Sequence, residues 1–184
     1  MNEMKLEPAG LTLDQLRNLG AGPVRVSIPD SAWAVTRESH AHLEAVVAST
    51  NPAYGINTGV GKLAQTRIAA ADVTTLQQNL VRSHAAGVGD PLPIPVVRLA
   101  LALKALSLAQ GYSGVRPEII VWLLQMLAED IVPVIPEKGS VGASGDLAPL
   151  AHLSLPLMGE GEVFYNGDRL PSAEVLQAIG LEPL

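Results

Sequence analysis

The segment Ala143-Ser144-Gly145 is the part of this chain whose residue types and spacing could make a reactive group. In a tightly bent loop, the amide nitrogen of an unhindered glycine can attack the carbonyl two residues earlier and close a five-membered ring. Loss of water from the ring and of the Ser144 hydroxyl would leave a methylidene-imidazolone (MIO), whose exocyclic carbon is a strong electrophile. The sequence has no cysteine, so thiol nucleophiles, disulfides and thiolate metal sites are excluded.

The residues that follow this tripeptide are expected to form a helix over residues 146–157, because Pro149 is tolerated in a first turn. The positive end of that helix would stabilise negative charge that develops on the ring when a nucleophile adds. Taken alone, the pentapeptide Gly142-Ala143-Ser144-Gly145-Asp146 is more commonly a flexible helix entry with a serine or aspartate cap. The longer context therefore decides between the two interpretations.

Residues 139–152 read Gly-Ser-Val-Gly-Ala-Ser-Gly-Asp-Leu-Ala-Pro-Leu-Ala-His. This run resembles, residue after residue, the signature of the aromatic amino-acid ammonia-lyases and aminomutases. Residues 54–59, Tyr-Gly-Ile-Asn-Thr-Gly, resemble the N-terminal catalytic loop of the family, and residues 79–89 resemble its substrate-selectivity helix. The resemblance implies the N-terminal domain of the ammonia-lyase fold and an MIO cofactor formed autocatalytically from Ala143, Ser144 and Gly145.

The resemblance also implies roles for two residues of the loop that contains residues 54–61. It implies that Tyr54 is the base that removes the β-proton of the substrate, while the substrate's amino group or its ring engages the electrophile. Gly61 is a candidate substrate-binding residue in the same loop. Val60 stands where the family usually has phenylalanine, so the wall of the loop is expected to be roomier.

The pair Ser83-His84 resembles histidine ammonia-lyases, whereas tyrosine-specific relatives often have His-Leu and phenylalanine-specific relatives Phe-Leu at this place. We predict that both residues bind substrate, because His84 can bind or polarise an imidazole through either ring nitrogen. The expected reaction is elimination of ammonia from L-histidine to give trans-urocanate. A tyrosine or phenylalanine ammonia-lyase, or an aminomutase, would use the same electrophile and stays an alternative.

The end of the chain at Leu184 has no polar tail, and chains of the resembled family are much longer, with later residues in the same active site. We expect an N-terminal portion that is inactive without the remainder. A second alternative is an inactive fragment that acts only as a structural or interaction piece. The family implies a small amino-acid substrate and a homo-oligomer, a tetramer at full length.

Charge and hydropathy exclude several partners. The net charge is −6, and the 12 Lys and Arg residues are scattered, so no basic stripe could neutralise phosphates and nucleic acid is not an expected partner. The most apolar stretch, residues 92–109, contains Arg98 and Lys104, each costing about 2.5 to 3.5 kcal/mol at a bilayer centre. No membrane span is expected. The first ten residues lack an apolar signal-peptide core, and a cytoplasmic location is predicted.

The sequence was also compared with the patterns of a phosphate-binding loop and of a histidine metal site. Residues 55–62 differ from a phosphate-binding loop because Gly55 and Gly61 are one residue too far apart and Leu63 replaces the required Ser or Thr. His40 and His42 diverge on a helix and are expected to be solvated polar residues. Neither a nucleotide nor a metal is therefore expected.

The elements that must position these residues are mostly helices. Hydrophobic residues make up 48% of the chain and aromatic residues only 3%, which favours close-packed helices. We predict one domain over residues 1–184, mainly α with a few short β-strands and hairpins. Expected helices cover 12–19 (capped by Thr12 and ended by Gly20), 31–49, 71–86, 93–110, 117–130 and 172–179, besides 146–157.

The remaining segments are expected as strands and loops. A strand is predicted over 24–28 and a hairpin over 162–170 around Asn166-Gly167, with loops at 51–61 and 132–145. The helices at 93–110 and 117–130 are apolar on most faces, which indicates deep burial or a partner surface.

Overall fold

The computed structural model describes residues 2–49, 51–64, 66, 68–143 and 145–184. Most of the described chain is helical, as the sequence predicted. The helices are α1 (Leu13–Ala21), α2 (Asp30–Ala48), α3 (Val73–His84), α4 (Ile94–Leu108), α5 (Pro117–Glu129), α6 (Leu147–Ser154) and α7 (Ser172–Ile179), with short 3-10 segments η1 (Gly61–Leu63), η2 (Ala70–Asp72) and η3 (Leu155–Met158).

Short strands form small sheets between the helices. β1 (Asn2–Lys5) pairs in parallel with β2 (Val24–Ser27), β3 (Val88–Pro91) pairs antiparallel with β5 (Pro136–Lys138), and β4 (Val132–Pro133), β6 (Glu162–Tyr165) and β7 (Asp168–Pro171) form an antiparallel sheet in the order β4-β6-β7. The predicted strand at 24–28 and the hairpin at 162–170 are confirmed. The expectation of a continuous loop over 132–145 is wrong, because β4 and β5 pair with β6 and β3.

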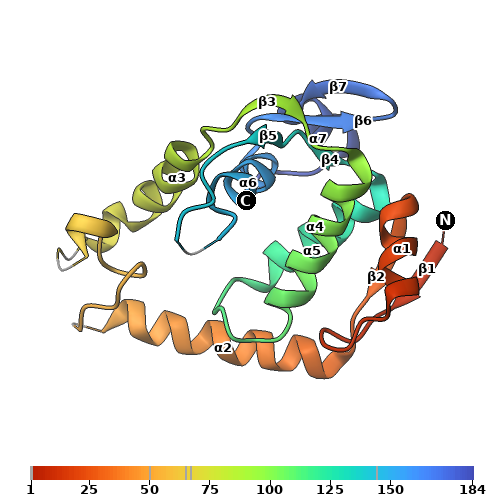
Figure 1. The fold of residues 1–184 in the computed structure, drawn as a ribbon. Coiled ribbons are helices and arrows are strands. Elements are labelled where there is room, and N and C mark those ends of the chain that lie inside the picture. Colours follow the sequence, from red (N-terminus) through yellow and green to blue (C-terminus); the bar gives the residue numbers. More distant parts are fainter. Residues whose placement is uncertain (1, 50, 65, 67, 144) are drawn as a thin grey trace.

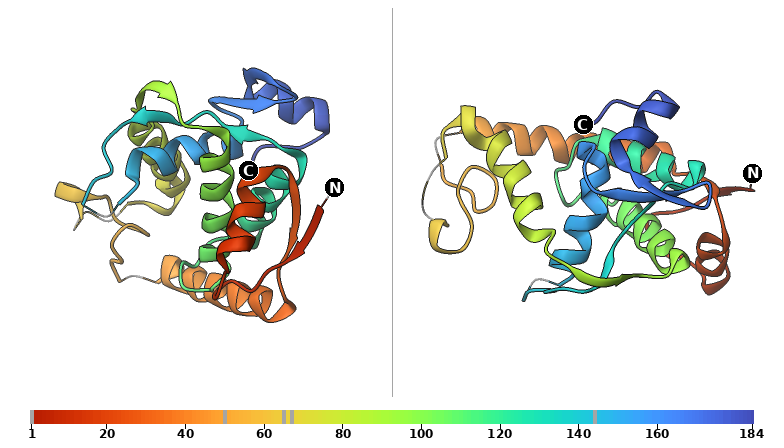
Figure 2. Two further views of the ribbon diagram at one scale, coloured as in Figure 1. Left: turned by 45° about the vertical axis from the view of Figure 1, so that its right-hand side comes forward. Right: turned by 90° about the horizontal axis from the view of Figure 1, so that it is seen from above.

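The centre of the molecule is the pair α4 and α5 (Figure 1). α4 packs on α5 and α1, while α5 also packs on β2 and α2. α2 lies across one end of this pair and the β6–β7 hairpin lies near the other end in Figures 1 and 2. The largest fully buried side chains of the pair are Leu101, Leu106, Ile120, Leu123, Met126 and Leu127.

Of the two alternatives for the apolar faces of α4 and α5, deep burial is the one that the structure shows. The large apolar side chains that these helices leave exposed are Val96, Leu103 and Val121. Most of the apolar surface of both helices is therefore covered within this chain. In the described ranges no helix is both long enough and apolar enough to cross a membrane.

α1 begins where the sequence predicted, but it ends later than predicted. The Thr12 hydroxyl accepts the Gln15 amide at 3.2 Å, and the Gln15 side chain accepts the Thr12 amide at 2.8 Å, which is a complete capping box. The prediction that Gly20 ends the helix is wrong, since α1 continues to Ala21 and Gly20 is buried. An added Cβ on Gly20 would lie 3.4 Å from Leu99 Cγ, an ordinary packing distance, so α1 rests directly on α4 at this residue.

His40 was expected to be a solvated helix residue, and this is wrong. Its Nδ1 lies 3.0 Å from the Gly114 carbonyl oxygen, and only 24% of its side chain is exposed. Because a carbonyl can only accept, Nδ1 carries the proton and donates it. His40 thereby ties α2 to the segment between α4 and α5. In the described segments no group of three His, Asp or Glu side chains is suited to hold a metal ion.

A bidentate ion pair between Arg98 and Asp130 joins α4 to the end of α5. Nε donates to Oδ1 at 2.8 Å and Nη2 donates to Oδ2 at 2.7 Å, and 14% of the Arg98 side chain is exposed. Asp130 has a left-handed backbone with φ +55, a conformation that asparagine tolerates better than alanine does.

We expect Asp130→Asn to lower the free energy of unfolding by about 1 to 3 kcal/mol, because it removes a charge-assisted pair and leaves the Arg98 charge half-buried. Asp130→Ala should cost more, since it adds backbone strain. Chemical denaturation of the two variants measures the cost of losing the ion pair and the added cost of the backbone strain. An asparagine variant as stable as the unmutated protein would show that the ion pair contributes nothing.

Candidate active site

The loop that carries Tyr54 is built around two buried polar residues. Asn57 accepts the Ala53 amide through Oδ1 at 2.7 Å and donates through Nδ2 to the Asn51 carbonyl oxygen at 3.0 Å. Thr58 is 1% exposed. These contacts fix the backbone from inside the loop, while the Tyr54 side chain stays 66% exposed. The predicted base is therefore held on an ordered loop with its ring open to solvent.

One hydrogen bond connects this loop to α3. The Gln77 side chain donates through Nε2 to the Gly55 carbonyl oxygen at 3.4 Å. Gly61, the predicted substrate-binding glycine, begins η1 with φ +58, and an added Cβ there would meet nothing within 4 Å. Gly61 therefore lies at an open position, where it needs the left-handed freedom of glycine.

Ser83 and His84 lie in the last turn of α3 and share one acceptor. The Ser83 hydroxyl donates to the Leu80 carbonyl oxygen at 3.0 Å, and His84 Nδ1 lies 2.7 Å from the same oxygen. Since the carbonyl only accepts, Nδ1 must carry the proton. This tautomer makes Nε2 of His84 an acceptor, and Nε2 has no hydrogen-bond partner within the part of the chain that the structure describes.

The segment predicted to form the ring lies between β5 and α6, and Ser144 itself is outside the described residues. Gly142 and Gly145 bracket the segment with φ +63 and +88, and an added Cβ on Gly145 would meet nothing within 4 Å. Ala143 and Gly145 are exposed. Cyclisation requires a tight bend and an unhindered glycine, and the left-handed backbone and open surroundings of Gly145 are compatible with the MIO group. Asp146 has φ +50 and makes no side-chain cap, which is unlike an ordinary capped helix entry.

The start of α6 closes the base of this loop. The Leu147 amide donates to the Val141 carbonyl oxygen at 3.2 Å, and the Ala148 amide donates to the Ser140 carbonyl oxygen at 2.9 Å. Pro149 has no amide hydrogen. The amides of Leu147 and Ala148 therefore hold the stem of the loop and are not free to donate to a ring formed there, while the predicted effect of the positive helix end on such a ring stays a prediction.

The structure brings the end of α3 and the stem of this loop together. The Gly87 amide donates to Nε2 of His152, on α6, at 2.9 Å. By contrast, no hydrogen bond or ion pair joins the Tyr54 loop to residues 139–147 among the residues described. Sequence reasoning quoted His152 in the family signature without giving it a role. It also missed Asn57 and Thr58, although their position between Gly55 and Gly59 was a usable signal.

We expect the His152–Gly87 contact to make stability depend on pH. Burial lowers the pKa of His152 below its ordinary value of about 6.5, because desolvation penalises the charged form. The unfolded chain then binds this proton at a higher pH than the folded chain, so stability is lost as the pH falls below about 6.5.

The measurement is the free energy of unfolding between pH 7 and pH 5, for the unmutated protein and for His152→Gln. The unmutated protein should lose more stability over this range than the variant, which has no group to protonate at this place. The other three histidines are present in both proteins, so their contribution cancels in the difference. Parallel curves for the two proteins would contradict the prediction.

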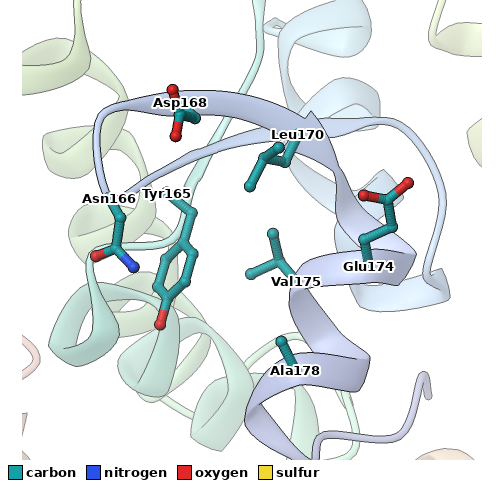
Figure 3. A pocket seen from close by; sticks show the side chains of 7 residues that line it. All are labelled: Tyr165, Asn166, Asp168, Leu170, Glu174, Val175 and Ala178. Atoms are coloured by element: carbon teal, nitrogen blue, oxygen red, sulfur yellow. The ribbon is translucent and has the colours of Figure 1, made fainter.

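A cavity in the described part of the chain lies away from these residues. It has a volume of about 320 Å³ and is lined by Tyr165, Asn166, Asp168, Leu170, Glu174, Val175 and Ala178. Figure 3 shows that it opens between the β6–β7 hairpin and α7. None of the predicted site residues lines it.

Known proteins similar to this chain all point to one family. The family described as "Aromatic amino acid lyase" matches residues 11–184. A histidine ammonia-lyase of Stigmatella aurantiaca is 51% identical over 174 residues, which are 95% of this chain and 34% of that protein. A histidine ammonia-lyase of Enterobacter sp. (strain 638) is 50% identical over 184 residues, 100% of this chain and 36% of that protein.

The fold agrees with these matches. The crystal structure of tyrosine aminomutase from Streptomyces globisporus has a TM-score of 0.91 and 37% identity, and the match covers 99% of this chain and 34% of that one. The chain thus spans about a third of the length of the curated relatives it matches. The family matches nearly the whole of this chain, and the fold is shared. The chain therefore belongs to the aromatic amino acid lyase family.

Proposed function

We propose that this chain takes part in eliminating ammonia from L-histidine to give trans-urocanate. The observation that carries the proposal is the identity of about half of all residues to curated histidine ammonia-lyases, along essentially the entire chain. A carbon–nitrogen lyase is therefore the class of enzyme that we propose.

We propose that Ala143, Ser144 and Gly145 form the MIO ring. The bend around Gly142 and Gly145 and the open space at Gly145 support this. When formed, the ring would supply an electrophilic carbon for the amino group or the imidazole of the substrate. The proposal requires neither a metal nor a nucleotide.

Recognition of an imidazole is proposed for Ser83 and His84. The imidazole of histidine carries one donor and one acceptor, and leaving either unpaired on burial costs roughly 1 to 3 kcal/mol. The tautomer of His84 that is fixed by the Leu80 carbonyl leaves Nε2 as an acceptor. We propose that Nε2 accepts the N–H of the substrate's imidazole, directly or through water, and that Ser83 shapes the same end of α3.

Removal of the β-proton is proposed for Tyr54, with Gly61 as a substrate contact in the same loop. Their exposure in this chain, and the exposure of Val88, Val141 and Leu147, support a site that is completed by further chain or by other copies. Exposed apolar residues near a polar site are typical of an interface. We propose a homo-oligomer, a tetramer, located in the cytoplasm.

The test uses the protein in its active form, with any further chain that activity requires. Intact mass should be lower than the encoded mass by two waters, and Ser144→Ala should restore the encoded mass and abolish ammonia release. Values of kcat/KM for histidine, tyrosine and phenylalanine, before and after His84→Leu, assign the substrate. Preference for phenylalanine in the unmutated enzyme, or unchanged preference after His84→Leu, would refute histidine.

A tyrosine substrate is the second candidate, because the phenol hydroxyl could also donate to Nε2 of His84 and because an aminomutase acting on tyrosine shares this fold. In that case tyrosine would be preferred in the assay. Release of β-tyrosine in place of ammonia would then separate an aminomutase from a lyase.

A further inference from the structure

His152 makes a contact that reaches from one part of the candidate site to another. Its Nε2 accepts the amide of Gly87 at 2.9 Å, and Gly87 follows the substrate-contacting residue His84 by only three residues. Because Nε2 accepts, the proton of the neutral ring is on Nδ1. The two partners are 65 positions apart in the sequence, and the bond joins the segment that follows α3 to α6.

The packing around Gly87 is so tight that a side chain there would have to displace its neighbours. An added Cβ would lie 3.0 Å from Nε2 of His152 and 3.2 Å from Cβ of Pro136. The backbone of Gly87 is not in the left-handed region, so the need for glycine here is the close approach and not the conformation.

Both stems of the ring-forming loop meet at the same place. An added Cβ on Gly139 would lie 3.0 Å from Cβ of Ala148 and 3.4 Å from Cα of Gly87. The Ala148 amide closes the loop onto the Ser140 carbonyl oxygen at 2.9 Å. The strand before the loop, the helix after it and the segment after α3 are therefore in direct contact around Gly87.

We propose that His152 is a positioning residue that fixes the Ser83–His84 end of α3 relative to the loop of Ala143 to Gly145. The inference rests on the proposed function, because it explains how His84, which is proposed to bind the substrate's side chain, is held relative to the loop proposed to form the MIO ring. Within the described residues, no hydrogen bond or ion pair joins His152 to Ser83, His84, Ala143 or Gly145. His152 acts through the Gly87 amide, and without that bond the three-residue link from His84 can shift against the loop stem.

Two kinds of readout distinguish positioning from a merely structural role. A structural defect lowers the fraction of active enzyme, so kcat falls equally for every substrate while KM and the preference among substrates stay the same. Loss of alignment changes KM and the ratio of kcat/KM for histidine to that for phenylalanine. Intact mass gives the ring content of each variant and corrects the rates for it.

The experiment compares three variants of the active protein. His152→Leu removes the acceptor at similar volume, His152→Gln keeps an acceptor, and Gly87→Ala pushes a methyl group against the His152 ring. His42→Leu, on the exposed surface of α2, is the control. We expect His152→Leu and Gly87→Ala to lower the histidine-to-phenylalanine preference roughly tenfold, as for loss of one buried hydrogen bond, and His152→Gln to restore most of it.

Hydrogen–deuterium exchange of the peptide covering residues 84–91 tests the contact with no reference to a substrate. Exchange there should rise in His152→Leu and return toward the unmutated rate in His152→Gln. Faster exchange with an unchanged substrate preference would overturn the inference and leave the proposed function intact. An unmutated enzyme with full ring content that releases no ammonia from histidine would instead overturn the proposed function, and the inference with it.

Discussion

Tyr54→Phe is expected to lower kcat for ammonia release from histidine by roughly 10²- to 10⁴-fold, the contribution typical of a general base. The change removes only the hydroxyl. The Tyr54 ring is 66% exposed and the loop is fixed by the buried Asn57 and Thr58, so the loop and the free energy of unfolding should be unaffected. Loss of rate without loss of stability is thus the expected signature.

Tyr112→Phe is the matched control, because Tyr112 is 88% exposed and has no role in the proposed site. Steady-state kinetics and intact mass of both variants, at equal ring content, make the comparison. If Tyr54→Phe kept a rate within a few-fold of the Tyr112→Phe rate, another group would have to remove the β-proton.

Leu101→Ala is expected to lower the free energy of unfolding by about 2 to 5 kcal/mol, because it empties space at the contact between α4 and the elements packed on it. Leu101 is 0% exposed and lies in the middle of α4. α4 packs against α1, α5 and β4, so a cavity there weakens the centre of the fold.

Leu103→Ala on the same helix is the control for helix propensity, since Leu103 is 46% exposed. Its cost should be below about 1 kcal/mol, in the range of surface substitutions. Urea denaturation of both variants gives the difference. Equal costs at the two positions would mean that α4 is not buried on the face that carries Leu101.

Local signals in the sequence were enough for most helices and for one hairpin. Thr12 and Gln15 form the predicted capping box, and α5 begins at Pro117 as predicted. Asn166 and Gly167 adopt φ +52 and +90 between β6 and β7, the backbone that a two-residue hairpin turn needs. In each case the residues that determine the conformation are also its neighbours in the chain.

The short sheets and the end of α1 depended on tertiary contacts. β1, β3 and β5 have four, four and three residues, and their sequences lack the alternation of apolar and polar residues that predicted β2. Their hydrogen bonds come from partners far along the chain, and so does the close approach of Leu99 that buries Gly20. No local pattern reports such pairings.

For the candidate site, the segments around Tyr54, His84 and Ala143 are long continuous motifs, so the sequence alone was enough to identify the family and to predict which residues react. How those segments are joined depends on contacts between residues far apart in the chain. The contact of His152 with Gly87 and that of His40 with Gly114 span 65 and 74 residues. A histidine's partner and tautomer are set by whichever carbonyl or amide the fold brings within 3 Å of its ring, and sequence spacing does not encode that distance.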